Sequence, residues 1–154
     1  MKVYIGSDHR GFDLKTTLLS FLEENHFEAQ DMGALKLVST DDYVDYSSSV
    51  AKAVADDIQK GVEARGIVIC GSGFGVDFTA NKINGIRCGI GFEEAQVKHG
   101  RTNDDINVLA LASMFTDTEN VKRMVKVFLE TAFSGEERHV RRIEKIRQIE
   151  ISKS

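Results

Sequence analysis

Short apolar runs separated by polar segments form the main pattern of this chain. Three runs rich in Val, Ile and Leu, at residues 2–6, 66–70 and 106–111, are bounded by glycine or polar residues. Runs of this length and composition are typical of buried strands. Weaker runs at residues 27–33 and 86–91 predict two further strands. The pattern therefore indicates strands spread along the whole chain.

Between the predicted strands, apolar residues recur at every third or fourth position, which is the spacing of one helix face. Helices are therefore expected over residues 12–24, 43–58, 73–83, from about residue 93, over 116–129 and over about 136–150. Strands that alternate with helices form a parallel sheet covered on both faces. The predicted fold is α/β: a single-domain, three-layer Rossmann-like sandwich over residues 1–154, with a five-stranded parallel sheet and a C-terminal helix.

Composition narrows the class of protein without changing this picture. The formal net charge of −4 gives no electrostatic case for binding nucleic acid. No apolar run approaches the ~20 residues that span a bilayer, so no membrane partner is expected. The chain reaches the polar Ser7 and Asp8 too early for a signal peptide, so a cytoplasmic location is expected. Two cysteines, Cys70 and Cys88, make neither a disulfide framework nor a metal site, and Cys88 is expected to be a small buried hydrophobe.

The glycine-rich run at residues 70–75, Cys-Gly-Ser-Gly-Phe-Gly, is the strongest candidate for chemistry. It follows a predicted strand and precedes a predicted helix, an arrangement that presents backbone N–H groups to an anion. The run lacks the Lys-Ser/Thr of a nucleotide P-loop, and its spacing differs from the dinucleotide fingerprint. A second polar loop, residues 7–11, leaves another strand, and parallel sheets bind ligands at such ends. A thiol at this turn indicates chemistry on a phosphorylated small molecule.

The last predicted helix is strongly basic. Arg138 and Arg142 lie one turn apart, so they are candidates for a phosphate clamp. A solvated charged face is the alternative interpretation. The same helix carries Ile143, Ile146 and Ile149, which offer apolar surface for a subunit interface.

Five motifs occur in one order along the chain: residues 6–12, 70–75, 80–82, 85–87, and Arg-His-x-x-Arg at 138–142. In this combination the chain resembles the type B ribose-5-phosphate isomerases, a family that includes galactose-6-phosphate isomerase subunits. The resemblance covers about residues 2–147. It implies an aldose–ketose isomerase of a sugar phosphate that needs no metal or cofactor. The expected reaction converts ribose 5-phosphate to ribulose 5-phosphate through a cis-enediolate.

The resemblance also implies roles for the glycine-rich turn. Cys70 matches the family's thiol base, and Val76 replaces the Glu that another branch uses, so the chain follows the cysteine branch. Ser72 stands where a hydroxyl moves protons between substrate oxygens. The backbone of the turn is expected to hold the developing enediolate oxygen, as an oxyanion hole does. The substrate-binding residues expected here are Gly71, Gly73, Phe74 and Gly75.

Further substrate contacts are implied elsewhere in the chain. Asp8 and His9 match the family's substrate-binding pair, although a helix-capping Asp beside a surface His is the structural alternative. Arg138 and Arg142 match its phosphate-binding arginines, and His139 is expected on the same wall. The family assembles as dimers or tetramers that share active sites, so a homodimer or homotetramer is expected, with the helix over about 136–150 at the interface.

One segment departs from the family pattern. Where the family commonly has a His that opens the furanose ring, this chain has Asn103, which cannot titrate. The next position, expected to contact substrate, is Asp104. His99 lies four residues before Asn103 on the same helical face and is a candidate substitute, a solvated surface His being the alternative. Met114 ends the run that replaces the family's Gly-x-Arg.

These departures leave two alternatives to the ribose reaction. A tetrose or hexose phosphate is one, because an altered pocket accepts an altered substrate and an open-chain sugar needs no ring opening. A non-catalytic or partner-dependent subunit of the same family is the other. Retention of Cys70, Asp8 and His9 argues against a decayed site.

Overall fold

The computed structural model describes residues 1–152 and contains one parallel sheet. Its strands are β1 (Lys2–Ser7), β2 (Ala29–Asp31), β3 (Ala64–Cys70), β4 (Cys88–Ile90) and β5 (Val108–Ala112). Every neighbouring pair is parallel, in the order β2-β1-β3-β5-β4. The predicted five-stranded parallel sheet is confirmed.

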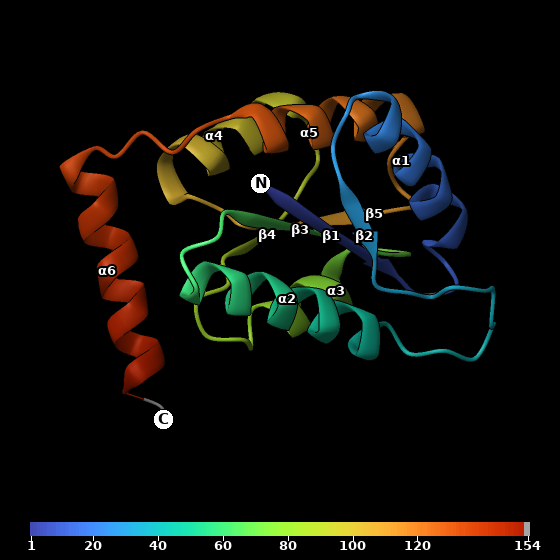
Figure 1. Cartoon of the computed structure of the whole chain (residues 1–154), viewed down its shortest axis with the longest axis horizontal. Coiled ribbons are helices and arrows are strands. Elements are labelled where there is room, and N and C mark those ends of the chain that lie inside the picture. Colours follow the sequence, from blue (N-terminus) through green and yellow to red (C-terminus); the bar gives the residue numbers. More distant parts are fainter. Residues whose placement is uncertain (153–154) are drawn as a thin grey trace.

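Helices cover both faces of this sheet, as the sequence pattern predicted. They are α1 (Phe12–Glu24), α2 (Tyr43–Gln59), α3 (Phe74–Ala80), α4 (Glu94–Asp104), α5 (Thr118–Glu130) and α6 (Glu137–Ile151). Helices α1, α4 and α5 lie on one face, and α2 and α3 lie on the other (Figure 1). The three-layer architecture is therefore confirmed, with α6 outside the layers.

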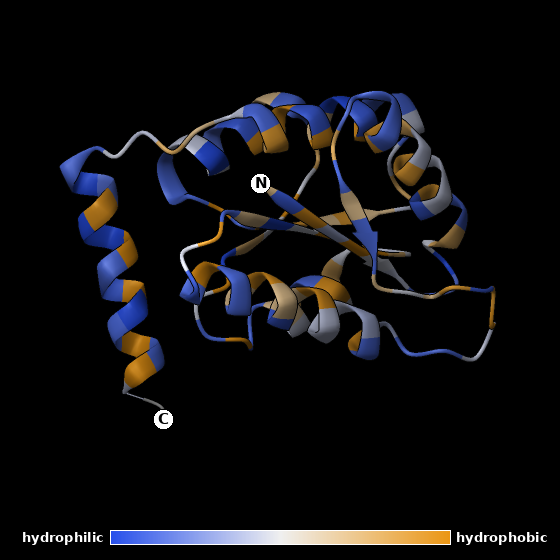
Figure 2. Cartoon of the chain, in the orientation of Figure 1, coloured by the Kyte–Doolittle hydropathy of each residue, from blue (hydrophilic) through white to orange (hydrophobic). Residues whose placement is uncertain are grey.

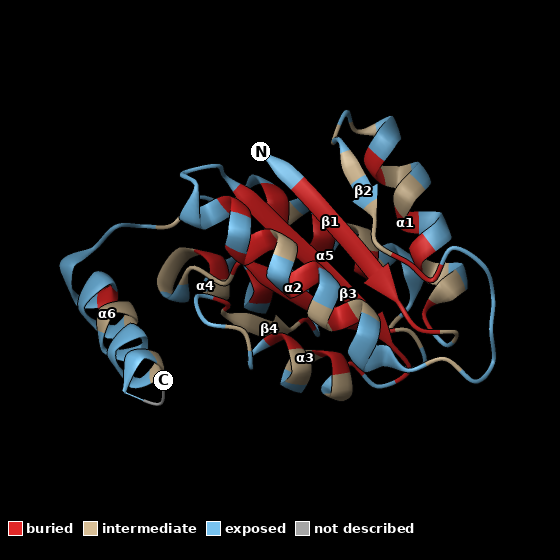
Figure 3. Cartoon of the chain, turned by 60° about the horizontal axis from the view of Figure 1, so that its bottom comes forward, coloured by how far each residue is buried: buried red, intermediate tan, exposed pale blue. Residues whose placement is uncertain are grey.

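The central strands are buried on both faces (Figure 3). Along β3, Ile67 and Ile69 join the apolar cluster beneath α1 and α5. Val68 and Cys70 belong to the opposite cluster, beneath α2 and α3. Successive side chains of a strand point to opposite faces. The same alternation thus builds two cores and places the Cys70 thiol on the α2–α3 side at the end of its strand.

The strand order creates a crevice at the carboxyl edge of the sheet. Strands β1 and β3 are neighbours, with Ser7 opposite Ile69 in the register. The chain leaves β1 toward α1 on one face and leaves β3 toward α3 on the other (Figure 1). Loops that diverge in this way mark the topological switch point, where parallel sheets bind ligands. The two predicted chemical motifs lie at this point.

Helix α6 is attached to the body at its two ends. Near its start His139 is 2% exposed, and its Nδ1 lies 2.8 Å from the Ser134 hydroxyl. Near its end Glu150 accepts the backbone N–H of Gly85 at 3.0 Å. Apolar positions recur along its length (Figure 2), and several of them are exposed: Val140, Ile146, Ile149 and Ile151. The helix therefore carries apolar surface that this chain alone does not bury.

Candidate active site

A cleft of about 670 Å³ opens at the switch point. Its lining residues are Asp8, His9, Arg10, Asp41, Asp42, Tyr43, Cys70, Gly71, Ser72, Gly75, Phe78, Met114 and Phe115. The fold thus brings the loop after β1 and the glycine-rich turn into one site, as the sequence predicted. The segment at residues 41–43 and the run after β5 complete its walls.

The thiol of Cys70 is held by the turn that follows it. The residue is 4% exposed, and the backbone N–H of Gly73 donates to its Sγ at 3.2 Å. Gly73 precedes α3 with φ +79°, a left-handed conformation that glycine adopts without steric cost. The carbonyl of Cys70 accepts the backbone N–H of Ser113 at 3.0 Å. Both sides of the turn are therefore fixed, and the Gly73 N–H is bound to sulfur.

Asp8 organises the loop that faces this turn. Its Oδ1 accepts the backbone N–H groups of Arg10 at 3.0 Å and of Gly11 at 3.1 Å. Burial raises the pKa of the Asp8 carboxyl, and these two hydrogen bonds oppose that rise. Asp8 thus closes the turn before α1 and does not cap the helix, whose N-cap is Gly11, so the helix-capping alternative is wrong. The same residue lines the cleft.

His9 is paired with an aspartate that is distant in sequence. Its Nδ1 lies 2.7 Å from Oδ1 of Asp41, and its backbone N–H donates to the same oxygen at 2.9 Å. Burial raises the pKa of the Asp41 carboxyl, but the hydrogen bonds from His9 and Tyr46 outweigh it, so the pKa falls below its ordinary value of 3.8. Asp41 is therefore the charged partner of His9.

Sequence reasoning missed Asp41 and Tyr43 as site residues. In the sequence, Asp41 and Asp42 only precede the helix expected over residues 43–58, and Tyr43 is only its first residue. Asp42 is indeed the N-cap of α2. Asp41 lies 32 residues from His9 along the chain, so only the tertiary fold brings them together.

Three expected residues on α4 lie outside the Cys70 cleft. The Asn103 side-chain nitrogen is 2.9 Å from Nε2 of His99; His99 is exposed and Asn103 is half-buried. His99 and Asp104 border a separate cavity of about 280 Å³ against β4. Within one chain, neither Asn103 nor His99 lines the cleft that contains the thiol.

The basic residues of α6 are also apart from the cleft. Arg138 and Arg142 are exposed, and Arg138 donates to the Glu136 carboxylate at 2.8 Å. Helix α6 stands beyond the amino edge of the sheet, whereas the cleft lies at the carboxyl edge (Figures 1 and 3). His139 is buried against Phe133 and Ser134, which favours a structural role for it in this chain.

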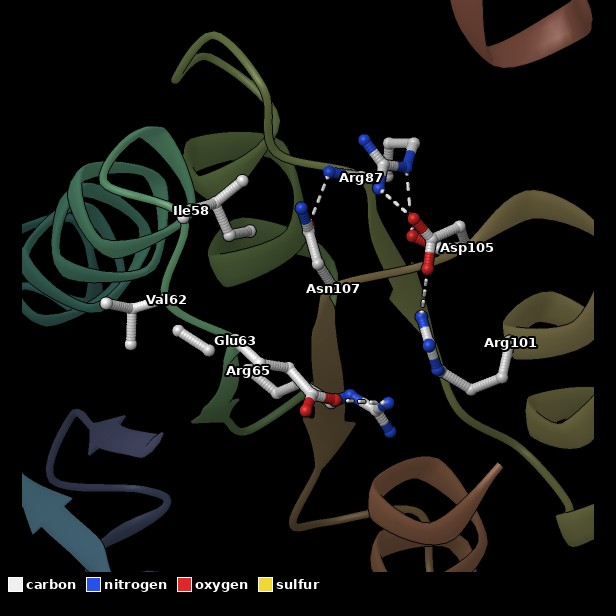
Figure 4. A pocket seen from close by; sticks show the side chains of 10 residues that line it. Ile58, Val62, Glu63, Arg65, Arg87, Arg101, Asp105 and Asn107 are labelled. Carbon is white, nitrogen blue, oxygen red and sulfur yellow. Dashed lines mark hydrogen bonds and ion pairs between the residues drawn. The ribbon is translucent and has the colours of Figure 1, made fainter. Parts of the chain in front are cut away.

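A second cavity, of about 360 Å³, lies near the amino ends of β3 and β5 (Figure 4). Asp105 accepts from Arg101 and from Arg87, each at 2.7 Å. Burial, together with the nearby Arg101, lowers the pKa of Arg65 to about 10. The carboxylate of Asp105 ties the end of α4 to the start of β4. This network is structural, and it fixes where Asn103 lies.

A three-layer α/β sandwich with a thiol and a histidine–aspartate pair in its switch-point cleft is the architecture of a sugar phosphate isomerase. Residues 3–146 match the sequence model of the Ribose/Galactose Isomerase family, and the chain belongs to that family. The probable ribose-5-phosphate isomerase B of Mycoplasma pneumoniae is 38% identical over 144 residues, 94% of this chain and 91% of that protein. The ribose-5-phosphate isomerase B of Escherichia coli K12 is 38% identical over 149 residues, 97% of this chain and 96% of that protein.

Solved structures of the family agree with this assignment. Ribose-5-phosphate isomerase B of Clostridium thermocellum superposes with a TM-score of 0.92 at 36% identity, covering 100% of both chains. The Mycoplasma genitalium protein, solved with bound ribulose-5-phosphate, gives 0.90 at 35% identity, covering 97% of this chain and 95% of that one. The predicted family, fold and enzyme class, an aldose–ketose isomerase, are confirmed. Across residues 1–152, no helix has the length and apolarity needed to span a bilayer.

Proposed function

We propose that this protein interconverts ribose 5-phosphate and ribulose 5-phosphate, with Cys70 as the base. The thiolate removes the proton from carbon 2 of the open-chain aldose, a cis-enediolate forms, and the proton returns to carbon 1. The position of the Cys70 thiol in the cleft, with the Gly73 N–H donating to Sγ at 3.2 Å, is the observation that carries the proposal. This hydrogen bond fixes the sulfur at the carboxyl end of β3, where it faces the cleft.

The surrounding residues supply the other parts of this reaction. The Ser72 hydroxyl lines the cleft and moves a proton between the two substrate oxygens. The Gly73 N–H is bound to sulfur, so the enediolate oxygen is held by the remaining N–H groups of the turn. Those groups belong to Gly71, Ser72, Phe74 and Gly75.

A second copy of the chain completes the site in this proposal. The cleft and its rim expose Phe74, Phe78, Met114 and Phe115, which are 53%, 62%, 60% and 77% exposed. Apolar surface of this kind beside a cleft is typical of an interface. Helix α6 has apolar surface of its own, and its exposed Arg138 and Arg142 meet a phosphate in the partner's cleft, Arg138 leaving its exposed partner Glu136. The assembly is a homodimer or homotetramer, located in the cytoplasm.

Purified wild-type protein and the variants Cys70→Ala and Cys70→Ser, assayed on a panel of sugar phosphates, test the proposal. We expect ribose 5-phosphate to be the best substrate and both variants to lose at least a thousand-fold in turnover. Circular dichroism checks that the variants stay folded. Unchanged turnover in Cys70→Ala would rule out the cysteine mechanism. If a tetrose or hexose phosphate were turned over faster than ribose 5-phosphate, that sugar would be the substrate. Inactivity on every sugar phosphate would indicate a partner-dependent subunit.

A further inference from the structure

The cleft contains a second group that is suited to moving protons. The Asp41 side chain is 7% exposed and His9 is 27% exposed, so the carboxylate is buried behind the imidazole. A carboxylate only accepts hydrogen bonds, so the 2.7 Å contact requires a proton on Nδ1 of His9. In the neutral ring the lone pair then lies on Nε2, which makes no hydrogen bond within the described residues. The pair presents an oriented base to the same cavity as the Cys70 thiol.

The proposed reaction needs such a group before Cys70 can act. An aldose 5-phosphate exists in solution mainly as a closed furanose, and its carbon 2 proton becomes acidic only when carbon 1 is a free aldehyde. Asn103 cannot transfer a proton, and neither it nor His99 lines the cleft of its own chain. Asp8 lines it, with Oδ1 engaged by two backbone N–H groups, and Asp42 lines it at the N-cap of α2. His9 is the lining residue whose ring is oriented by a buried carboxylate, with Nε2 left without a hydrogen bond among the described residues.

Accepting the function proposed above, the geometry points to His9 as the acid–base group that opens the furanose ring, with Asp41 as its positioning residue. Nε2 takes the proton of the anomeric hydroxyl, and the released electron pair forms the C1=O1 double bond. The bond from C1 to the ring oxygen O4 breaks as O4 takes the proton from Nε2. One proton moves from O1 to O4, and His9 ends neutral. The Asp41 carboxylate stabilises the transient imidazolium.

Two measurements on the His9→Gln variant separate ring opening from isomerisation. Ribulose 5-phosphate cannot close a furanose, because its 5-oxygen carries the phosphate. Deuterium exchange at its carbon 1 in D₂O therefore reports Cys70 chemistry alone. We expect His9→Gln to exchange deuterium within about three-fold of wild type, while its kcat/KM for conversion falls about a hundred-fold in both directions, the range of a lost general acid–base group.

Control variants and the wild-type assay distinguish a failure of the His9 role from a failure of the proposed isomerase activity. His26→Asn removes an exposed His at φ +62°, a conformation that Asn tolerates, and leaves both rates unchanged. Asp41→Asn lowers conversion about ten-fold, keeps exchange, and alters the ¹⁵N shifts of the His9 ring that report the Nδ1–H tautomer. Exchange and conversion falling together in His9→Gln, or neither falling, would overturn the role of His9. A wild-type protein that does not convert ribose 5-phosphate would instead overturn the function proposed above.

Discussion

The ring of Tyr43 packs directly on the backbone of Gly75. A Cβ built on Gly75 would lie 2.6 Å from Cζ of Tyr43 and 2.7 Å from Cε2, closer than real Cβ contacts come. Tyr43 begins α2 and Gly75 lies in the first turn of α3, and both line the Cys70 cleft. The contact therefore sets the distance between two helices at the wall of the site.

Replacing Gly75 with Ala should impair catalysis more than folding. Tyr43 is 39% exposed, so its ring can swing outward, and the loss of stability should be about 1 kcal/mol. The displaced ring reshapes the cleft, and kcat/KM should fall at least ten-fold. Urea unfolding and an isomerase assay measure the two effects. Gly89→Ala is the control, since its nearest neighbour would be 3.6 Å away, and wild-type activity in Gly75→Ala would contradict the prediction.

Lys15 is a buried cation whose partners hold the segment after β2. It is 1% exposed, and Nζ donates to both oxygens of Asp31 at 2.6 and 2.7 Å and to the Ala34 carbonyl at 2.6 Å. Asp31→Ala leaves a buried charge without its counter-ion, which should cost about 3–5 kcal/mol. Lys15→Met removes the buried charge, leaves the Ala34 carbonyl unpaired and leaves the Asp31 carboxylate, which is 28% exposed, to water, and it should cost about 1–2 kcal/mol. Urea denaturation gives both values, and a larger loss in Lys15→Met would contradict this account.

The stability of the protein should depend on pH through the ionisation of Asp57. Its carboxylate accepts from the Tyr4 hydroxyl at 2.6 Å and pairs with Lys2 at 3.0 Å. The hydrogen bonds from Tyr4 and Lys2 lower the pKa of Asp57 below 3.8. A lowered carboxyl pKa contributes stability that is complete above the unfolded-state value and is lost as the pH falls through the folded-state value.

Asp57→Asn should therefore be less stable than wild type near neutral pH, and the difference should shrink in strong acid. Urea unfolding at about pH 6 and about pH 2 tests this. Asp56→Asn changes the exposed neighbouring carboxylate and serves as the control. An equal destabilisation of Asp57→Asn at both pH values would show that the pair acts through packing and not through charge.

The sequence predicted the central strands better than the edge strands for a physical reason. Strands β1, β3 and β5 are buried on both faces, so their apolar runs mark them clearly. Strands β2 and β4 have three residues each, shorter than the predicted runs. The predicted runs began too early, at Phe27 and Ile86, because both residues are apolar and pack on the core although they lie outside a strand. Strand order depends on pairing between distant segments, which periodicity does not report.

The candidate site was predictable where its chemistry lies at strand ends. Asp8, His9 and Cys70 follow apolar runs, and the switch-point rule places such loops together. Asp41 follows an irregular segment with no periodic signal, and only the folded chain reveals its contact with His9. The role of Arg142 stays a prediction, because α6 does not reach the cleft of its own chain.

A complementation experiment tests whether two chains share each site. Cys70→Ala is defective in the cleft, and Arg142→Ala is defective on α6. In a hybrid dimer, one site combines both defects, while the other combines an intact cleft with an intact α6. If the chains associate at random, half of the dimers are hybrids. One of the two sites in each hybrid works, so one quarter of all sites are active. Co-expression of the two inactive variants should then restore about one quarter of wild-type activity.

A second pair of variants controls for nonspecific recovery. Cys70→Ala and His9→Gln both alter the cleft of a single chain, so every site of their hybrid carries one of the two defects. Co-expression of this pair should restore nothing beyond the residual activity of His9→Gln. Size-exclusion chromatography with light scattering confirms that dimers are present. Equal recovery by both pairs, or none from the first pair in a protein shown to be dimeric, would mean that α6 does not complete the partner's site.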